Sequence, residues 1–269
     1  MSLLAALCLG AGSAASAQQA PSDSSPAHTP VLTSRDVITA AVFIAGTAAI
    51  MPFDRHIAVE SQRSSLQNNS ALHNTLTGIR DLGEPGSIII AGATYVYGRA
   101  GNSPRSAELG LRAIESFGAA GIVTTLIKGV TGRARPYVTA DSNARDFKLG
   151  RGFRDDRYMS FPSGHVTTAF SIASAASEEI PYLWPHASKI WTPLLFTTAS
   201  LVGVARVYED KHWASDVIAG AAVGTLVSRV VVRYQRAHPG NSIDRVLLPA
   251  GVSQASGGHG VAFSWNYQW

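Results

Sequence analysis

Charged residues are scarce in this chain of 269 residues. They make up 15% of it, while hydrophobic residues make up 46%. The charged fraction is well below the roughly 25% that is usual for a soluble domain. A chain of this length can bury one substantial core. The composition therefore indicates either one apolar helical bundle or a protein that contacts a membrane.

Cysteine is almost absent. The single one, Cys8, lies in an apolar run from Leu3 to Leu9. Ala15-Ser16-Ala17 then matches the small-x-small pattern of signal-peptide cleavage, although no Lys or Arg precedes the apolar run. We interpret residues 1–17 as a secretory signal peptide; the alternatives are an ordinary disordered terminus or a true start upstream of Met1. Cleavage would leave a mature chain without a thiol, which excludes disulfides and a cysteine nucleophile.

Long uninterrupted apolar runs are lacking as well. Residues 37–53 are 17 uncharged positions, at the short edge of the roughly 20 that span a bilayer. Charged residues interrupt the later apolar stretches at Glu115, Lys128, Arg206 and Asp216. Charges inside a membrane are costly unless they face a polar cavity, so the sequence favours a soluble or peripheral bundle. With the signal peptide, this predicts a periplasmic or cell-envelope location, with integral insertion in the inner membrane as the alternative.

The net charge is small, at +4, and no basic stripe accompanies it. This argues against a nucleic-acid partner. A modest positive balance suits an anionic substrate, and contact with a membrane surface is compatible with it.

Helical periodicity dominates the middle of the chain. Residues 107–128 have the apolar spacing of an amphipathic helix, and further helical runs follow at 163–178, 190–207 and 212–233. Near the end, alternation from Val261 to Trp269 is typical of a half-buried strand, with 245–252 as its partner across a turn at 256–258. We therefore expect an all-α helical bundle with a C-terminal β-hairpin. The predicted organisation is a flexible lead-in at 18–32, a helical domain at 33–240 and the hairpin extension at 241–269.

Two cations flank the end of an apolar helix. Lys128 closes the helix, and Pro136 prevents Arg135 from continuing into another one. Either cation alone is consistent with a solvated helix end. Two neighbouring desolvated cations need a partner, and an anion would serve.

The tetrapeptide Pro162-Ser163-Gly164-His165 stands where a helix is expected to begin. Ser is a good N-cap, and a free helix N-terminus offers backbone N–H groups to an anion. Gly164 removes the side chain that would block close approach of a phosphate. The alternative is a Ser-capped helix with an incidental His165.

His212 and Asp216 are four residues apart in a predicted helical run, hence on one face of it. A carboxylate there can accept the N–H of one ring nitrogen and leave the other as a free lone pair. This makes a histidine a directed base or nucleophile. The alternative is an ordinary helix pair.

Together the three clusters resemble the signature of the type 2 phosphatidic acid phosphatase and vanadium haloperoxidase superfamily. They match in order as Lys128-x6-Arg135-Pro136, Pro162-Ser163-Gly164-His165 and Arg206-x5-His212-x3-Asp216. The resemblance spans about residues 107 to 233. One position departs: the family usually has Ser before the third-motif Arg, where this chain has Ala205. That position supplies a supporting hydrogen bond and no bond-making group.

The resemblance implies an all-α bundle with its site between helices, and a role for each motif residue. Phosphate oxygens would be held by Lys128, Arg135, Ser163, Gly164 and Arg206. His212 would attack phosphorus, oriented by Asp216, to form a phosphohistidine. His165 would protonate the leaving oxygen and later activate water. Phosphoryl transfer asks mainly for positioning and for charge at the equatorial oxygens, which three cations supply.

The implied activity is that of a metal-independent phosphatase acting on a lipid phosphate, an isoprenyl pyrophosphate or a small soluble phosphoester. The sequence shows no carboxylate cluster suited to Mg²⁺ and no His/Cys set for zinc, so no cofactor is expected. Vanadate would be an inhibitor. In a haloperoxidase, the second hypothesis, the same pocket would hold vanadate as cofactor. The third hypothesis, a non-catalytic envelope binding protein, is disfavoured because every motif position carries a competent residue.

Overall fold

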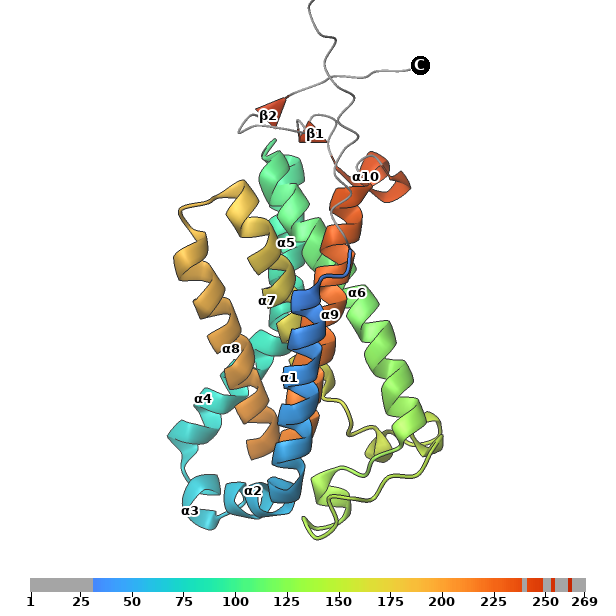
Figure 1. Ribbon diagram of the computed structural model, residues 1–269. Helices are drawn as coiled ribbons and strands as arrows, with labels where there is room; N and C mark the ends of the chain where they lie inside the picture. Colours follow the sequence, from blue (N-terminus) through green and yellow to red (C-terminus); the bar gives the residue numbers. More distant parts are fainter. Residues whose placement is uncertain (1–30, 239–240, 249–252, 255–260, 263–269) are drawn as a thin grey trace, which may run out of the picture.

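The computed structural model describes residues 31–238, 241–248, 253–254 and 261–262, and in that part of the chain it is a bundle of α-helices (Figure 1). The longer helices are α1 (Ser34–Ile50), α4 (Ser70–Asp81), α5 (Ser87–Ala100), α6 (Pro104–Thr131), α7 (Gly164–Leu183), α8 (Ser188–Tyr208) and α9 (Ala214–Ala237). The short helices are α2 (Asp54–Ser61), α3 (Ser64–Gln67) and α10 (Ser242–Leu247). The all-α fold class is confirmed.

Helix α7 lies at the centre of the bundle. It packs against α6, α8 and α9, while α5 packs on α6, α4 on α8 and α1 on α9. The α7–α9 contact is close because two glycines of α9 face α7. A Cβ at Gly220 would lie 2.6 Å from the Ser163 carbonyl oxygen, and one at Gly224 would lie 2.5 Å from that of Thr167. The start of α7 is thereby held directly against α9.

The four predicted helical runs are present as α6, α7, α8 and α9, each a few residues longer or shifted at its ends. One boundary matters for the site. Helix α9 begins at Ala214 with Trp213 as its N-cap, so His212 precedes the helix. The prediction that His212 and Asp216 share a helical face is therefore wrong.

The predicted hairpin differs from the structure in its first half. Residues 245–247 belong to α10 and not to a strand, because the Asn241 side chain caps a helix that begins at Ser242. Two short strands, β1 (Ser253–Gln254) and β2 (Val261–Ala262), pair antiparallel further on. The alternating positions 263–269 lie outside the described residues, as do the predicted signal peptide and most of the lead-in.

Four helical segments are long and apolar enough to cross a membrane: Ser34–Ser61, Pro104–Thr131, Ser188–Tyr208 and Ala214–Ala237. Large apolar side chains point outward from them, among them Val42, Ile122, Leu126, Ile190 and Leu194. The interrupting charges that seemed to disfavour membrane insertion are turned inward: Lys128, Arg206 and Asp216 are all buried. The structure thus supports membrane association and the inner-membrane alternative over a soluble bundle, because the apolar surface is on the outside.

Candidate active site

The three sequence motifs meet at one end of the bundle, the lower end in Figure 1. Helix α6 ends there at Thr131, α7 starts at Gly164, and the segment between α8 and α9 contains His212. The end of α6 is fixed by Gly132, which has a left-handed backbone (φ 55°) and returns its N–H to the Lys128 carbonyl. A Cβ on Gly132 would lie 2.1 Å from the Lys148 carbonyl oxygen, so only glycine fits this turn.

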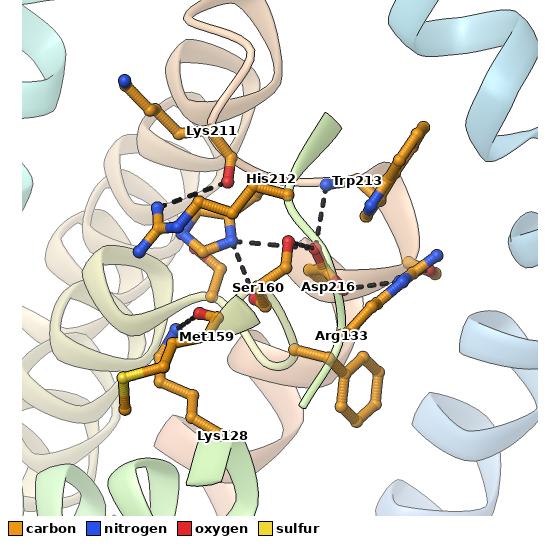
Figure 2. Close-up of polar contacts among 12 residues, drawn as sticks. Lys128, Arg133, Met159, Ser160, Lys211, His212, Trp213 and Asp216 are labelled. Carbon is orange, nitrogen blue, oxygen red and sulfur yellow. Dashed lines mark hydrogen bonds and ion pairs between the residues drawn. The ribbon is translucent and has the colours of Figure 1, made fainter. Parts of the chain in front are cut away.

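Lys128 and His212 are held by two consecutive backbone carbonyls (Figure 2). The Lys128 Nζ donates to the Met159 oxygen at 2.6 Å, and the His212 Nδ1 lies 2.8 Å from the Ser160 oxygen. One peptide unit therefore separates the anchors of the cation and the imidazole. Both side chains are buried.

The tautomer of His212 follows from its partner. A carbonyl oxygen can only accept, so Nδ1 carries the proton and Nε2 presents a lone pair when the ring is neutral. Burial lowers the pKa of His212 to about 3, against the opposing effect of Asp216, which raises it. His212 lies in the loop between α8 and α9. A neutral ring with a free Nε2 is the state that a nucleophile requires.

Asp216 does not bind His212 as directly as the motif predicts. Its Oδ2 is 3.7 Å from the His212 Nδ1, beyond hydrogen-bond length. The same oxygen accepts instead from the Ser160 hydroxyl at 2.6 Å and from the Trp213 N–H at 2.9 Å. Asp216 thus acts on the ring through Ser160 and through the field of its charge.

A buried ion-pair network behind Asp216 is absent from the sequence-based prediction. Arg133, fully buried, donates to Asp216 Oδ1 at 2.5 Å and to Asp54 Oδ2 at 2.7 Å. Asp54 also accepts from the backbone N–H of Ser215. A buried charge is tolerated only when it is paired and hydrogen-bonded, and this network meets both conditions. It fixes the start of α9, and with it Asp216.

The start of α7 offers free donors. Ser163 is the N-cap of α7, but its hydroxyl makes no capping bond. It is fully buried and has no hydrogen-bond partner among the residues that the structure describes. Its backbone N–H binds the Asp216 carbonyl at 2.9 Å, which ties the two helix starts together. A Cβ on Gly164 would lie 3.6 Å from the Lys128 Cε, so Lys128 passes over the helix N-terminus. An oxyanion placed there would meet a cation, a hydroxyl and N–H groups.

Two arginines complete the cationic lining. Arg135 donates to the Asp156 oxygen at 3.2 Å and to the Lys211 oxygen at 3.4 Å, next to His212. Arg206, buried, pairs with Glu209 and leaves its Nε without a partner. Glu209 in turn accepts from Arg80 at 3.0 Å. Within the described part of the chain, Arg206 therefore retains an unused donor.

His165 stands in the first turn of α7, half-buried. Burial and the nearby cations Arg206, Arg80, Lys128 and Arg135 lower the pKa of His165 to about 4. The negative charge of a bound phosphate would offset these cations and favour the protonated ring. Its Nδ1 is 3.4 Å from Glu84 Oε2. All eight residues of the predicted site are therefore at this end of the bundle.

The residues that the sequence analysis missed are Asp54, Arg133, Ser160 and Glu84. Asp54 and Arg133 are 79 positions apart, a separation over which no local pattern operates. Arg133 did carry a signal, since it lies between Lys128 and Arg135 in the first motif. Ser160 carried one too, two residues before Pro162.

A cavity of about 580 Å³ flanks the site on the side of the bundle, between α1, α6 and α9. Its lining is apolar apart from Thr47 and Arg145, and includes Phe43, Met51, Ala219 and Val223. Ile127 and Pro162 also line it, and they directly precede Lys128 and Ser163. The cavity therefore lies against the back of the phosphate-binding candidates.

Comparison with known proteins agrees with the motifs. Residues 109–239 match the family model of the PAP2 superfamily. The matched part of the chain contains most of α6 and all of α7 to α9. This match agrees with the resemblance inferred from the motifs.

Several proteins of similar sequence are phosphatases by name. The chain is 38% identical over 89 residues to a lipid A 1-phosphatase of Porphyromonas gingivalis, which covers 33% of this chain and 19% of that protein. It is 27% identical over 190 residues to phosphatidylglycerophosphatase B of Bacillus subtilis, covering 67% of this chain and 82% of the relative. The chain matches less than half the length of these lipid A 1-phosphatases, at most 40% of each.

A crystal structure shares the fold. It is that of a transmembrane PAP2 type phosphatidylglycerolphosphate phosphatase from Bacillus subtilis, with a TM-score of 0.56 and 23% identity. The similarity covers 78% of this chain and all of the other. The helices of this chain are therefore arranged as in that protein.

Proposed function

We propose that this chain is a phosphatase that hydrolyses phosphate monoesters of lipids through a phosphohistidine on His212. The observation that carries the proposal is the anchoring of Lys128 and His212 on the adjacent carbonyls of Met159 and Ser160. A cation for the phosphate oxygens and a neutral imidazole lone pair are thereby held next to each other. Phosphoryl transfer depends on this kind of positioning.

The remaining roles follow from the donors that the site leaves unused. Phosphate oxygens would bind Lys128, Arg135, Arg206 and the α7 N-terminus at Ser163 and Gly164. The Ser163 hydroxyl and the Arg206 Nε are buried without partners, and such atoms are costly unless a ligand satisfies them. His165, across from the cations, would donate the proton to the leaving oxygen and later activate water.

A lipid substrate is favoured by the apolar cavity and the apolar outer surface. An acyl or isoprenyl chain in the 580 Å³ cavity would place its head group beside Ser163 and Lys128. The relatives that are named for lipid A and phosphatidylglycerophosphate point the same way. No cofactor enters this mechanism, because the cations supply the charge that Mg²⁺ supplies elsewhere.

The test is phosphate release by the purified protein in detergent micelles with excess EDTA. Dioleoyl phosphatidic acid should be hydrolysed, and vanadate should inhibit because it can become five-coordinate and mimic the transition state. No release, or activity lost on chelation and restored by metal, would contradict the proposal. Peroxide-dependent bromide oxidation with vanadate would assign the site to a haloperoxidase instead.

A separate experiment tests the lipid assignment. Ala222→Trp, which fills the cavity, should raise the KM for dioleoyl phosphatidic acid severalfold and leave the dihexanoyl form unchanged. Ile190→Trp, on the outward face of α8, is the matched control and should change neither. Equal effects on both chain lengths would remove the cavity from the account.

A further inference from the structure

Glu84 brings a carboxylate to His165 from outside the superfamily motifs. Its Oε2 lies 3.4 Å from the His165 Nδ1, and both side chains are partly exposed at the mouth of the site. Glu84 is 25 residues before the matched region, which begins at residue 109. None of the three sequence motifs includes Glu84.

The chain segment between α4 and α5 is shaped to present this side chain. Residues Leu82–Gly86 interrupt the helical path, and Glu84 itself has an extended backbone (φ −154°, ψ 121°). Gly83 lets the segment approach α8, because a Cβ there would lie 2.6 Å from Val202 Cγ1. Val202 is one helical turn before Arg206, so the segment Leu82–Gly86 packs against the helix that carries a phosphate-binding candidate.

The end of α4, just before this segment, makes a second polar contact with the site. Arg80, near the end of α4, binds Glu209 at 3.0 Å, and Glu209 pairs with Arg206. Two separate polar contacts, at Arg80 and Glu84, thus connect the α4–α5 region to the site. A single incidental surface contact would not produce this arrangement.

We propose that Glu84 is the positioning residue of His165, and this rests on the proposed phosphatase function. The carboxylate accepts from the Nδ1–H and leaves Nε2 to serve the leaving oxygen. As the bond from phosphorus to the leaving oxygen breaks, the electron pair goes to that oxygen and the Nε2 proton is transferred to it. The ring becomes neutral and keeps its Nδ1–H on Glu84. In the second step Nε2 takes a proton from the water that attacks phosphorus. The bond from phosphorus to the His212 Nε2 breaks, and its electron pair returns to that nitrogen.

A competing role predicts the opposite result. Glu84 also acts electrostatically on Lys128 and Arg206, so its carboxylate would compete with phosphate if it were a plug in the cationic pocket. Removing a plug lowers KM, whereas removing a positioning group lowers kcat. The observed contact with the ring nitrogen favours positioning.

The experiment uses Glu84→Gln in the full chain with an alkyl phosphate and p-nitrophenyl phosphate. An alkoxide leaves only with a proton and a nitrophenolate does not need one. We expect kcat on the alkyl substrate to fall about tenfold or more, with little change on the aryl substrate. In the His165→Ala background, Glu84→Gln should add no further loss, because Glu84 acts through that ring. Asp81→Asn, three residues away and paired with Arg80, is the matched control and should behave as wild type.

Several outcomes overturn the assignment. One is an equal loss on both substrates, a second is a loss that multiplies with that of His165→Ala, and a third is a lower KM with kcat retained. Wild-type protein that hydrolyses neither these substrates nor dioleoyl phosphatidic acid would refute the proposed function itself, and the positioning role with it. Active wild type with an unaffected Glu84→Gln variant would refute the positioning role alone.

Discussion

His212 is held mainly by the protein backbone. Its Nδ1 binds the Ser160 carbonyl, while Asp216 binds the Ser160 hydroxyl and lies 3.7 Å from the ring. Ser160 therefore stands between the imidazole and the carboxylate. The carbonyl fixes the tautomer, and burial keeps the ring neutral by lowering its pKa.

The lowered pKa of His212 predicts a nucleophile that works at acid pH. An ordinary histidine with a pKa near 6.5 is about half neutral at pH 6.5 and only about 3% neutral at pH 5, so its lone-pair population would fall about fifteenfold over that range. His212, with its pKa near 3, should stay neutral there. The burst of p-nitrophenol from p-nitrophenyl phosphate should therefore keep its rate constant down to pH 5, once substrate titration is corrected for. A burst that falls with an apparent pKa near 6.5 would contradict this.

The same shift has a cost in stability, with a defined sign. Below pH 6.5 an unfolded His212 takes up a proton that the folded residue takes up only near pH 3. The free energy of unfolding therefore decreases as the pH falls through this window.

At the scale of elements, the site exists because three helix ends are fixed to one another. The start of α7 is bound to α9 through the Ser163 N–H and the Asp216 carbonyl. The start of α9 is bound through Arg133 to Asp54 at the start of α2. The donors of the site are thus placed by helix packing.

Gly220→Ala tests that packing. Its new methyl group would lie 2.6 Å from the Ser163 carbonyl oxygen, and overpacking of this kind typically costs about 1–3 kcal/mol. We expect a lower unfolding temperature in detergent and reduced activity, since the start of α7 must shift. Gly118→Ala in α6 is the matched control, because nothing lies within 4 Å of its Cβ and Ala favours a helix by about 1 kcal/mol. Equal behaviour of the two variants would show that the α7–α9 contact is not limiting.

Sequence analysis located four of the helices and all eight motif residues, because both depend on local signals. Periodicity marked α6 to α9, and the motifs marked the residues at their ends. The start of α9 was predicted two residues too early, at 212, because Trp213 is the N-cap and the helix begins at Ala214. Asp54, Arg133 and Glu84 were missed because each acts across a long stretch of chain. The departure at Ala205 is explained by the structure: it is fully buried beside Leu76 and Tyr208.

At the scale of the whole molecule, charges face inward and apolar side chains face outward. In the most apolar 18-residue stretch of the segment Ser34–Ser61, only 6% of the residues are buried. Such exposure is unusual for a water-soluble bundle but suits a helix in contact with lipid. The sequence argument treated interrupting charges as barriers to insertion. It could not show that they line a shared interior site, where their cost is offset.

Membrane integration can be measured by fractionation. We expect the protein to stay in the membrane pellet in high salt and in alkaline carbonate, and to be released only by detergent, because its outer surface is apolar on several helices. Release by carbonate would indicate peripheral attachment and restore the soluble interpretation.

The central claim is that phosphate passes through His212. The most direct measurement is rapid acid-free quenching of a reaction with ³²P-labelled p-nitrophenyl phosphate, followed by recovery of the protein. The account predicts label on the wild-type protein that is stable in base and labile in acid, located on the peptide that contains His212. His212→Ala should carry no label and show no turnover, while His186→Ala, between α7 and α8, should be labelled as wild type. Turnover by the His212→Ala protein, or label on another residue, would contradict the account.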